Sequence, residues 1–302
     1  LTGSRIISTK PIGVISGNQC TNIPVGNQWC DYTVEMQLPT MVWGKHYHVA
    51  KIPGRKYPSI IRVFAKEQDT KIFRDNRQIS FVPQVGGIQT KGFQEMRMHP
   101  REMDPHSVVI SGDKPIGVTL YNCGVQEDGY PLPNSDPFVE VQTPIEQYQN
   151  EITFCTPATF GGDKFAENYL NLVFHTDEYG FVPEDLKFAE VTGGNFEWQK
   201  LNSKFPGSGE MFRYDVDGKK YAAKTITLPV VGVFKIKADK PFAAYSFGYD
   251  WCDSYGYPTS AALANLEKPD TVPPEPPWTI DCYGNVNPDE KEQVTDMPDD
   301  DK

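Results

Sequence analysis

The sequence lacks the motifs that mark the common enzyme classes. It contains no GxSxG nucleophile elbow, no HExxH zinc motif, no phosphate-binding P-loop and no GxGxxG. A Cys–His nucleophile pair stays open on sequence grounds, although cysteines held in disulfides are poor nucleophiles. We therefore predict no catalytic residues, no cofactor and no hydrolysis by residues 1–302.

Long apolar runs and an excess of positive charge are also missing. No stretch approaches the roughly 20 apolar residues that cross a bilayer, and 29 Lys and Arg face 40 Asp and Glu, for a net charge of -11. Because phosphate backbones and anionic membrane surfaces attract Lys and Arg, this balance argues against nucleic acid and against direct membrane insertion. No signal peptide is visible, but Leu1–Gly3 leads directly into a strand pattern, so we expect an excerpt of a longer chain.

CxxC pairs and zinc-finger histidine spacings are absent, which argues against a zinc site. An even number of cysteines in polar or turn-rich sequence instead predicts disulfides and an oxidising, extracellular location. Pairing of neighbours is the simplest of the roughly 15 connectivities; six separate buried thiols are the alternative. The neighbour pairs are Cys20 with Cys30, Cys123 with Cys155, and Cys252 with Cys282.

One short phrase is written three times, as Lys10–Val14, Lys114–Val118 and Lys240–Ala244. Each copy follows an alternating apolar run, and in the first two copies a second phrase follows, Asp31–Pro39 and Asp136–Pro144. Proline at a strand entry costs no ladder hydrogen bond, and the glycine after it allows another backbone to approach closely. The pattern predicts an internal repeat of strand–loop–strand units.

Strand patterns run along the whole chain, as in Ser59–Ala65 and Tyr169–Phe174, whereas no segment keeps a helical period. We therefore predict an all-β fold of tandem β-sandwich modules. Prolines between residues 268 and 278 predict an extended, semi-rigid linker. The expected divisions are a first sandwich over residues 1–104, a second over 105–268, a Pro-rich linker over 269–279, and a following module or acidic tail over 280–302.

Several segments, taken in their order, resemble the N-terminal domain of the IgG Fc-binding protein family. They are Leu1–Val14, Ser16–Cys20, Cys30–Asp31, Trp43–Lys45 and Arg62–Thr70. Tyr245–Gly248 with Asp253–Pro258 is similar to a closing motif of large bacterial surface proteins, and the linker and acidic tail resemble junctions in proteins exported by type IX secretion. Tyr32 and Thr259–Ser260 depart from the family pattern. The resemblance implies an extracellular, non-catalytic binding or adhesion module, without implying that this chain binds immunoglobulin.

Three groups of polar residues are candidate sites. Glu35 and Glu140 occupy matching repeat positions, but such positions in tandem modules should lie far apart, so structural roles are predicted rather than paired acid chemistry. His46 and His48 would share one strand face, and without a third ligand nearby a solvated face is predicted rather than a metal site. Asp215–Gly218 lacks the full spacing of a calcium loop, and a type I′ hairpin turn explains it better.

Aromatic side chains gather near the end of the globular sequence. Tyr245, Phe247, Tyr249 and Trp251 alternate, which indicates one strand face packed in the core, although binding surfaces also use Tyr and Trp. Core packing is predicted for Tyr245 and Phe247, while both core and binding roles stay open for Trp251, Tyr255 and Tyr257. Binding is expected in the loops Gln19–Trp29 and Gly124–Asp136, unless these loops pack against a neighbouring module. The candidate contact residues are Trp29, Tyr130, Trp251, Tyr255 and Tyr257.

Together these features predict an extracellular, non-catalytic binding or adhesion module of a large cell-surface protein. Its partner would be an extracellular protein or glycan, or neighbouring modules of the same surface protein. The alternative is a glycan-binding module or part of a secreted carbohydrate-active enzyme. An exposed aromatic platform over Trp251–Tyr257 would favour the glycan interpretation, and a flat surface without a concave polar pocket would favour adhesion.

Overall fold

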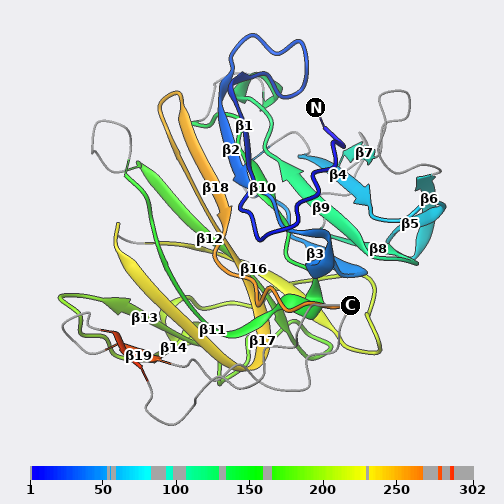
Figure 1. The fold of residues 1–302 in the computed structure, drawn as a ribbon. Helices are drawn as coiled ribbons and strands as arrows, with labels where there is room; N and C mark the ends of the chain where they lie inside the picture. The colour runs from blue at the N-terminus through cyan, green and yellow to red at the C-terminus, as the bar shows by residue number, and fades with distance from the viewer. Residues whose placement is uncertain are drawn as a thin grey trace. The chain divides into compact units, whose positions relative to one another are not determined.

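The computed structural model describes residues 2–52, 55, 59–82, 93–97, 107–128, 134–158, 165–228, 231–267, 278–280 and 286–288. These residues are almost entirely β-strand and connecting turns, which confirms the predicted all-β class. The chain forms two compact units, Leu1–Leu266 and Glu267–Lys302 (Figure 1).

The first ten strands are β1 (Ile15–Thr21), β2 (Asp31–Met36), β3 (His46–Val49), β4 (Ile60–Ala65), β5 (Thr70–Arg74), β6 (Arg77–Val82), β7 (Phe93–Arg97), β8 (Val108–Gly112), β9 (Ile116–Tyr121) and β10 (Val139–Val141). The later strands are β11 (Gln149–Cys155), β12 (Glu167–His175), β13 (Lys187–Val191), β14 (Gln199–Lys200), β15 (Glu210–Met211), β16 (Tyr221–Thr227), β17 (Val233–Asp250), β18 (Asp253–Pro258), β19 (Trp278–Ile280) and β20 (Val286–Pro288). The short helices are η1 (Thr40–Val42), η2 (Val125–Asp128), η3 (Ile145–Gln147) and α1 (Leu201–Lys204).

Two four-stranded sheets share a core in the first half of the larger unit. Their strand orders are β3–β8–β5–β6 and β10–β9–β4–β7, and each pair of neighbours is antiparallel. Along β4, the buried Ile61, Val63 and Ala65 alternate with the partly exposed Arg62 and Phe64. This period of two turns one strand face into the core and the other outward, and side chains from both sheets fill that core.

The second half is built around one long strand, β17. Its first part pairs with β11 and β13, and its second part pairs with β12 and β18. Phe234 and Ile236 from the first part, with Phe242 and Ala244 from the second, join the same core. A single strand therefore takes part in both layers of this half.

The two halves share one connectivity. In the first half, β8 lies between β3 and β5, and β9 lies between β10 and β4. In the second half, the first part of β17 takes the place of β8, between β11 and β13. The second part of β17 takes the place of β9, between β18 and β12. The expected division at residues 104 and 105 separates β8 from β3 and β5 and separates β9 from β4, whereas the sheets divide after β10. Independent folding of two modules stays a prediction.

The three copies of the Lys-Pro phrase make the same backbone hydrogen bond. In each copy, the residue that follows the second strand of the hairpin donates its backbone N–H to the carbonyl oxygen of the last residue of the phrase. The three bonds run from Gln37 to Val14 (2.8 Å), from Gln142 to Val118 (2.8 Å) and from Thr259 to Ala244 (2.9 Å). The hairpins β1–β2, β9–β10 and β17–β18 thus pair in one register, which supports the repeat; superposition of the copies stays a prediction.

Side chains from both halves also pack together. Phe247 and Tyr249 of β17 enter the first core, where both contact the ring of Phe138. A third cluster joins Val109 of β8 to Tyr245 of β17. Tyr245 and Phe247 are buried as predicted and Tyr249 is buried with them, whereas Trp251, the last member of the alternating series, is exposed.

The smaller unit is described at β19 and β20, which pair antiparallel with Ile280 opposite Val286. The expected linker over 269–279 and the module or tail over 280–302 otherwise lie outside the described residues. Among the described residues, no helix combines the length and the apolar character needed to cross a membrane.

Candidate functional site

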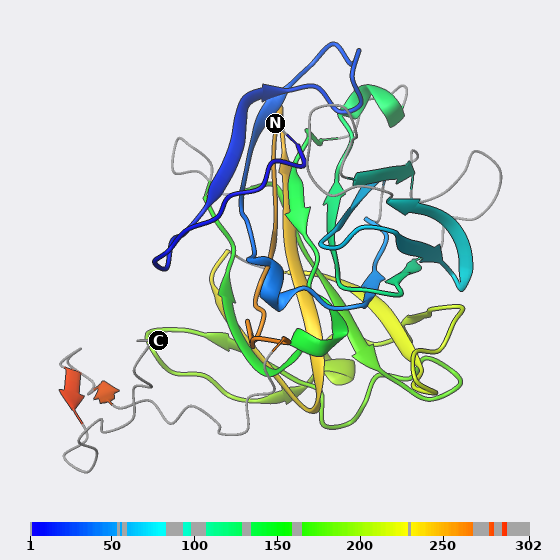
Figure 2. The same cartoon turned by 45° about the vertical axis from the view of Figure 1, so that its right-hand side comes forward.

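The tripeptide Trp-Cys-Asp occurs twice, as Trp29–Asp31 and Trp251–Asp253. The registers of β1–β2, β9–β10 and β17–β18 place Asp31, Asp136 and Asp253 at equivalent positions in their hairpins. The closing strands β2, β10 and β18 lie next to one another (Figures 1 and 2). The equivalent aspartates therefore meet, and we call these three residues the aspartate junction.

Burial governs the electrostatics of the aspartate junction. It raises the pKa of Asp31 to about 6 and that of Asp136 to about 7, and repulsion from Asp253 adds to both. The pKa of Asp253 is also raised, again mainly by burial. Within the described residues, Asp31 Oδ2 and Asp136 Oδ1 are buried without a hydrogen-bond partner. Carboxylates in this state bind protons more readily than exposed ones.

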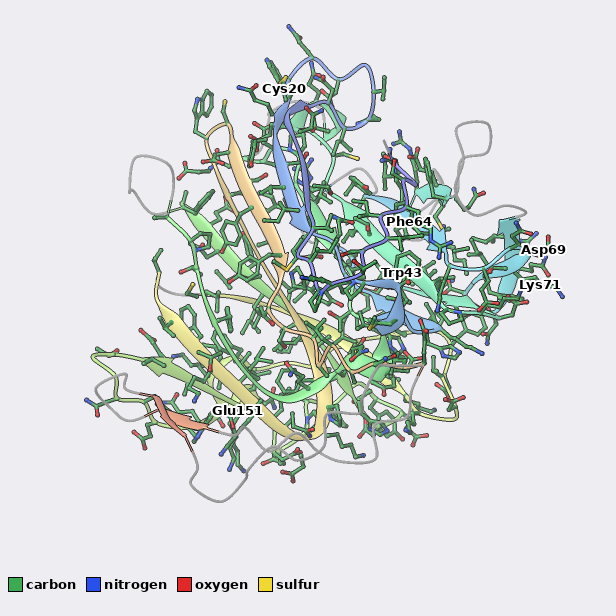
Figure 3. The ribbon with its side chains drawn as sticks, in the orientation of Figure 1. Cys20, Trp43, Phe64, Asp69, Lys71 and Glu151 are labelled. Atoms are coloured by element: carbon green, nitrogen blue, oxygen red, sulfur yellow. A yellow bond between two sulfur atoms is a disulfide. The ribbon has the colours of Figure 1, made fainter. Side chains whose placement is uncertain are left out.

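The two predicted binding loops contact each other at this end of the unit. Cys20 and Cys30 form the predicted disulfide across the first loop (Figure 3). Gly124 N–H donates to Ile23 O at 2.7 Å. The Gln28 backbone N–H donates to Gln126 Oε1, and the Gln126 side-chain amide donates to Gln28 Oε1 at 3.2 Å. The loops thus brace one another, and their role in binding stays a prediction.

Both tryptophans of the repeated tripeptide are exposed beside the aspartate junction. Trp251 is 81% exposed and Trp29 is 43% exposed. β2 and β18 begin at Asp31 and Asp253, and both pack beside β10, so the two tripeptides lie at one end of the unit. We call the surface of Trp29, Trp251 and the aspartate junction the tryptophan end. Tyr130, the remaining predicted loop contact, lies outside the described residues.

Tyr255 and Tyr257 are partly buried rather than splayed out beside Trp251. The Tyr255 hydroxyl donates to Asn168 Oδ1 at 2.8 Å, and its ring meets Phe165 edge-on. The Tyr257 hydroxyl donates to the Cys155 carbonyl. These two hydroxyls are committed inside the protein, so Trp251–Tyr257 does not form one continuous aromatic platform.

The predicted bridge between Cys123 and Cys155 is wrong. Cys155 ends β11 as an exposed, unpaired thiol opposite Val233, whereas Cys123 is buried with Ile23 and Ile60 in a different cluster. Cys252 is likewise exposed and unpaired, and its expected partner Cys282 lies outside the described residues. The sequence spacing did not show that Cys155 lies at the end of β11 while Cys123 follows β9 and is buried in another cluster.

Glu35 and Glu140 lie close together, and the expectation that they would lie far apart is wrong. β2 packs beside β10, so matching repeat positions meet instead of being a module length apart. Glu35 Oε2 accepts the Val141 N–H at 3.3 Å, and Glu140 Oε2 accepts the Gln142 side-chain amide at 2.8 Å. Burial raises the pKa of Glu35 to about 7 and that of Glu140 to about 8.

His46 and His48 do not form a solvated face. His46 Nδ1 lies 3.6 Å from Glu146 Oε1. His48 is fully buried between the rings of Phe212 and Tyr221, whose centroids lie 4.5 and 4.3 Å from the centroid of the imidazole ring. Burial lowers the pKa of His48 to about 3. No group of three or more His, Cys, Asp or Glu side chains in the described part of the chain is arranged to hold a metal ion.

The turn predicted at Asp217-Gly218 is present. Val216 and Lys219 exchange backbone hydrogen bonds of 3.2 and 2.9 Å, and both central residues have positive φ. The repeated Trp-Cys-Asp tripeptide, by contrast, was not used in predicting the site. Comparing the sequence that precedes each closing strand would have found it.

The comparisons with known proteins identify the family of the chain. The family model described as "IgGFc binding protein" matches residues 1–248. The chain belongs to the IgGFc-binding protein family. A human relative, "IgGFc-binding protein" from Homo sapiens, is 33% identical over 126 residues, which cover 41% of this chain. No solved structure matches the chain.

The IgGFc-binding family is named for binding rather than for a reaction. The matched segment spans only 2% of the length of the human relative. The family match extends through β17 nearly to its end, so it includes the first Trp-Cys-Asp tripeptide and stops short of the second. Family membership thus supports a binding module and leaves its ligand to be found.

Proposed function

We propose that this chain is an extracellular, non-catalytic binding module of a larger surface protein, and that it binds a protein ligand through the tryptophan end. The observation that carries the proposal is the convergence of equivalent closing hairpins, which brings Trp29 and Trp251 to one end beside the aspartate junction. Exposed tryptophans on a rigid support are typical anchors of protein interfaces.

The support beneath the tryptophans is rigid. Trp29 is followed directly by Cys30, which is bonded to Cys20, and the same loop is braced by Gly124 and Gln126. Trp251 sits in the tight turn between β17 and β18, where Asp250 pairs with Asp253. Side chains held in this way lose little conformational entropy when a ligand binds.

The aspartate junction adds a charge requirement to this surface. Its carboxylates are acidic groups that gain negative charge as pH rises through about 6 to 7. A ligand with a basic rim around an apolar centre would complement both features. Adhesion to a cell or matrix surface is one use of such a module.

The experiment measures binding of the 302-residue chain to immobilised immunoglobulin Fc, matrix proteins and a glycan array, with product release followed in parallel. Trp251→Ala is expected to weaken binding to the captured protein ligand by about 30-fold, the effect of losing one anchor residue. Tyr179→Ala removes an exposed aromatic that is no part of the tryptophan end and serves as the control. Unchanged affinity in Trp29→Ala and Trp251→Ala would contradict the assignment, and glycan-only binding would favour the alternative function.

A further inference from the structure

Among the described strands, none pairs with the hairpin β1–β2 from outside, unlike its equivalents. It forms a two-stranded sheet, and no described strand pairs with the other edge of β1. In the second copy, β4 covers that edge of β9; in the third, β12 covers the same edge of β17. The first copy is therefore an open version of a unit that is closed elsewhere in the same molecule.

The apolar side chains of the first copy are exposed where their equivalents are buried. Ile12 is 57% and Ile15 is 68% exposed, whereas the equivalent Ile116 is completely buried and Thr119 is 7% exposed. The preceding run, Ile6-Ile7, is likewise exposed, while the equivalent strand β8 is buried between β3 and β5. Contiguous apolar exposure of this kind marks an interaction site.

The surroundings of the glycine in the repeated phrase differ between the first and second copies. A Cβ placed on Gly117 would lie 2.7 Å from the indole ring of Trp43, so that ring occupies the space over this glycine (Trp43 is labelled in Figure 3). No described atom lies within 4 Å of a Cβ placed on Gly13. The first copy thus retains the seat for an aromatic ring, without a described ring in it.

The backbone of β1 is oriented to accept a further strand. Val14 O accepts the Gln37 N–H, so alternate residues of β1 bond toward β2. By the alternation of an antiparallel ladder, the N–H and C=O groups of Ile15 and Gly17 point to the open edge. The equivalent groups of β9 face β4, where Thr119 lies opposite Arg62.

We propose that the open edge of β1 pairs with an antiparallel strand from a further β-sandwich of this same fold. That strand lies along Ile12–Gly17, and an aromatic side chain of the same sandwich lies over Gly13. The occupant is a strand of the β4 type, with alternating apolar residues. Docking buries Ile12 and Ile15 as Ile116 and Thr119 are buried. This surface makes the chain one member of an array of sandwiches, and the inference does not rest on the ligand of the tryptophan end.

The test uses the strand β4 itself as the probe. A synthetic peptide of residues Ser59–Lys66 is added to the full chain, and amide exchange is measured at residues 12–17 by NMR. In a second arm, the same peptide sequence is tethered to the N-terminus by a flexible linker of about 12 residues, which raises its effective concentration to the millimolar range. We expect the Gly17 amide to exchange at least about tenfold more slowly in both arms.

Two variants of Ile15 make the result specific. Ile15→Pro removes the outward N–H and is expected to abolish the protection of Gly17, whereas Ile15→Thr keeps that N–H and reproduces the residue found at position 119. An unprotected Gly17 in the tethered chain would overturn the proposal, as would equal protection in Ile15→Pro. Dimerisation of the chain alone that Ile15→Pro abolishes would identify the further sandwich as a second copy of this chain and would support the proposal.

Discussion

The Val141 N–H donates to Glu35 Oε2 at 3.3 Å, so a carboxylate from the first repeat bonds to the backbone of the second. Val141 follows Glu140, the equivalent of Glu35, and repulsion between the two carboxylates adds to the rise in the pKa of Glu140. Matching residues of two repeats thus share one buried environment. Their protonation is linked to the packing of β2 against β10.

The first prediction is a loss of stability as pH rises from about 4.5 to about 8. Burial raises the pKa values of Glu35 and Glu140 from 4.5 to about 7 and about 8, so the folded state binds these protons more tightly than the unfolded state. Their stabilising contribution is complete below about pH 4.5 and declines as pH rises through 7 and 8. Glu140→Gln is expected to reduce the difference in unfolding free energy between pH 5 and pH 8 by on the order of 2 kcal/mol.

Urea unfolding at the two pH values measures this difference. Glu184→Gln, which alters a highly exposed carboxylate, is the matched control. Glu140→Gln keeps an oxygen acceptor for the Gln142 amide, so its effect reports the lost ionisation. A Glu140→Gln protein with the pH dependence of the unmodified chain would contradict the prediction.

A second prediction concerns acid. His48 is buried among Phe212 and Tyr221 with neither ring nitrogen hydrogen-bonded, and burial lowers its pKa to about 3. Because the folded state favours the neutral ring, this residue costs no stability above about pH 6.5 and destabilises the fold increasingly as pH falls toward 3. His48→Phe should therefore lose less stability than the unmodified chain between pH 7 and pH 5, by on the order of 1–2 kcal/mol. Urea unfolding at pH 7 and pH 5 measures this difference, and equal losses in the two proteins would contradict the prediction.

Two glycines of the repeated phrase provide a third test. Gly117→Ala brings a Cβ within 2.7 Å of the Trp43 ring, whereas Gly13→Ala meets no described atom within 4 Å. Overpacking of this kind costs about 1–3 kcal/mol, which should lower the Tm of Gly117→Ala by several degrees and leave that of Gly13→Ala nearly unchanged. Equal Tm values for the two variants would show that Trp43 does not hold its place over Gly117.

The disulfide allows a fourth prediction. Replacing Cys20 and Cys30 with Ser should lower the free energy of unfolding by about 2–3 kcal/mol, because the bridge no longer restricts the unfolded chain. The effect should be concentrated in the β1–β2 hairpin, because the remaining sheets do not pair with it. Hydrogen exchange should accelerate at Asp31–Met36 and stay unchanged at β12. Uniform acceleration across the chain would show that the hairpin is an integral part of the main cores.

Local signals accounted for most of what the sequence could predict. The all-β class, the Cys20–Cys30 bridge, the buried alternation through Tyr245–Tyr249 and the Asp217-Gly218 turn each depend on residues close together in the chain. Proximity in sequence limits the conformations of such segments strongly. For them, composition and spacing were sufficient.

The errors and omissions involve segments that are far apart in the chain. Nothing near Glu35 or Glu140 indicates that β2 will pack beside β10, and nothing near Cys155 separates it from Cys123, which is buried with Ile23 and Ile60. His48 is buried by Phe212 and Tyr221, which follow it much later in the sequence. The convergence of Trp29 and Trp251 likewise depends on how whole hairpins pack. Repeat equivalence was the one sequence feature that reached across these separations.

The continuity of β17 has a consequence for how this molecule can be divided and inherited. One uninterrupted strand serves both layers of the second half and also sends Phe247 and Tyr249 into the core of the first. A protein cut after β10 would lose the rings that pack against Phe138. Deletion or exchange of one half therefore exposes an unfinished core in the other, so insertions and recombination should be tolerated between complete pairs of halves rather than between the halves themselves.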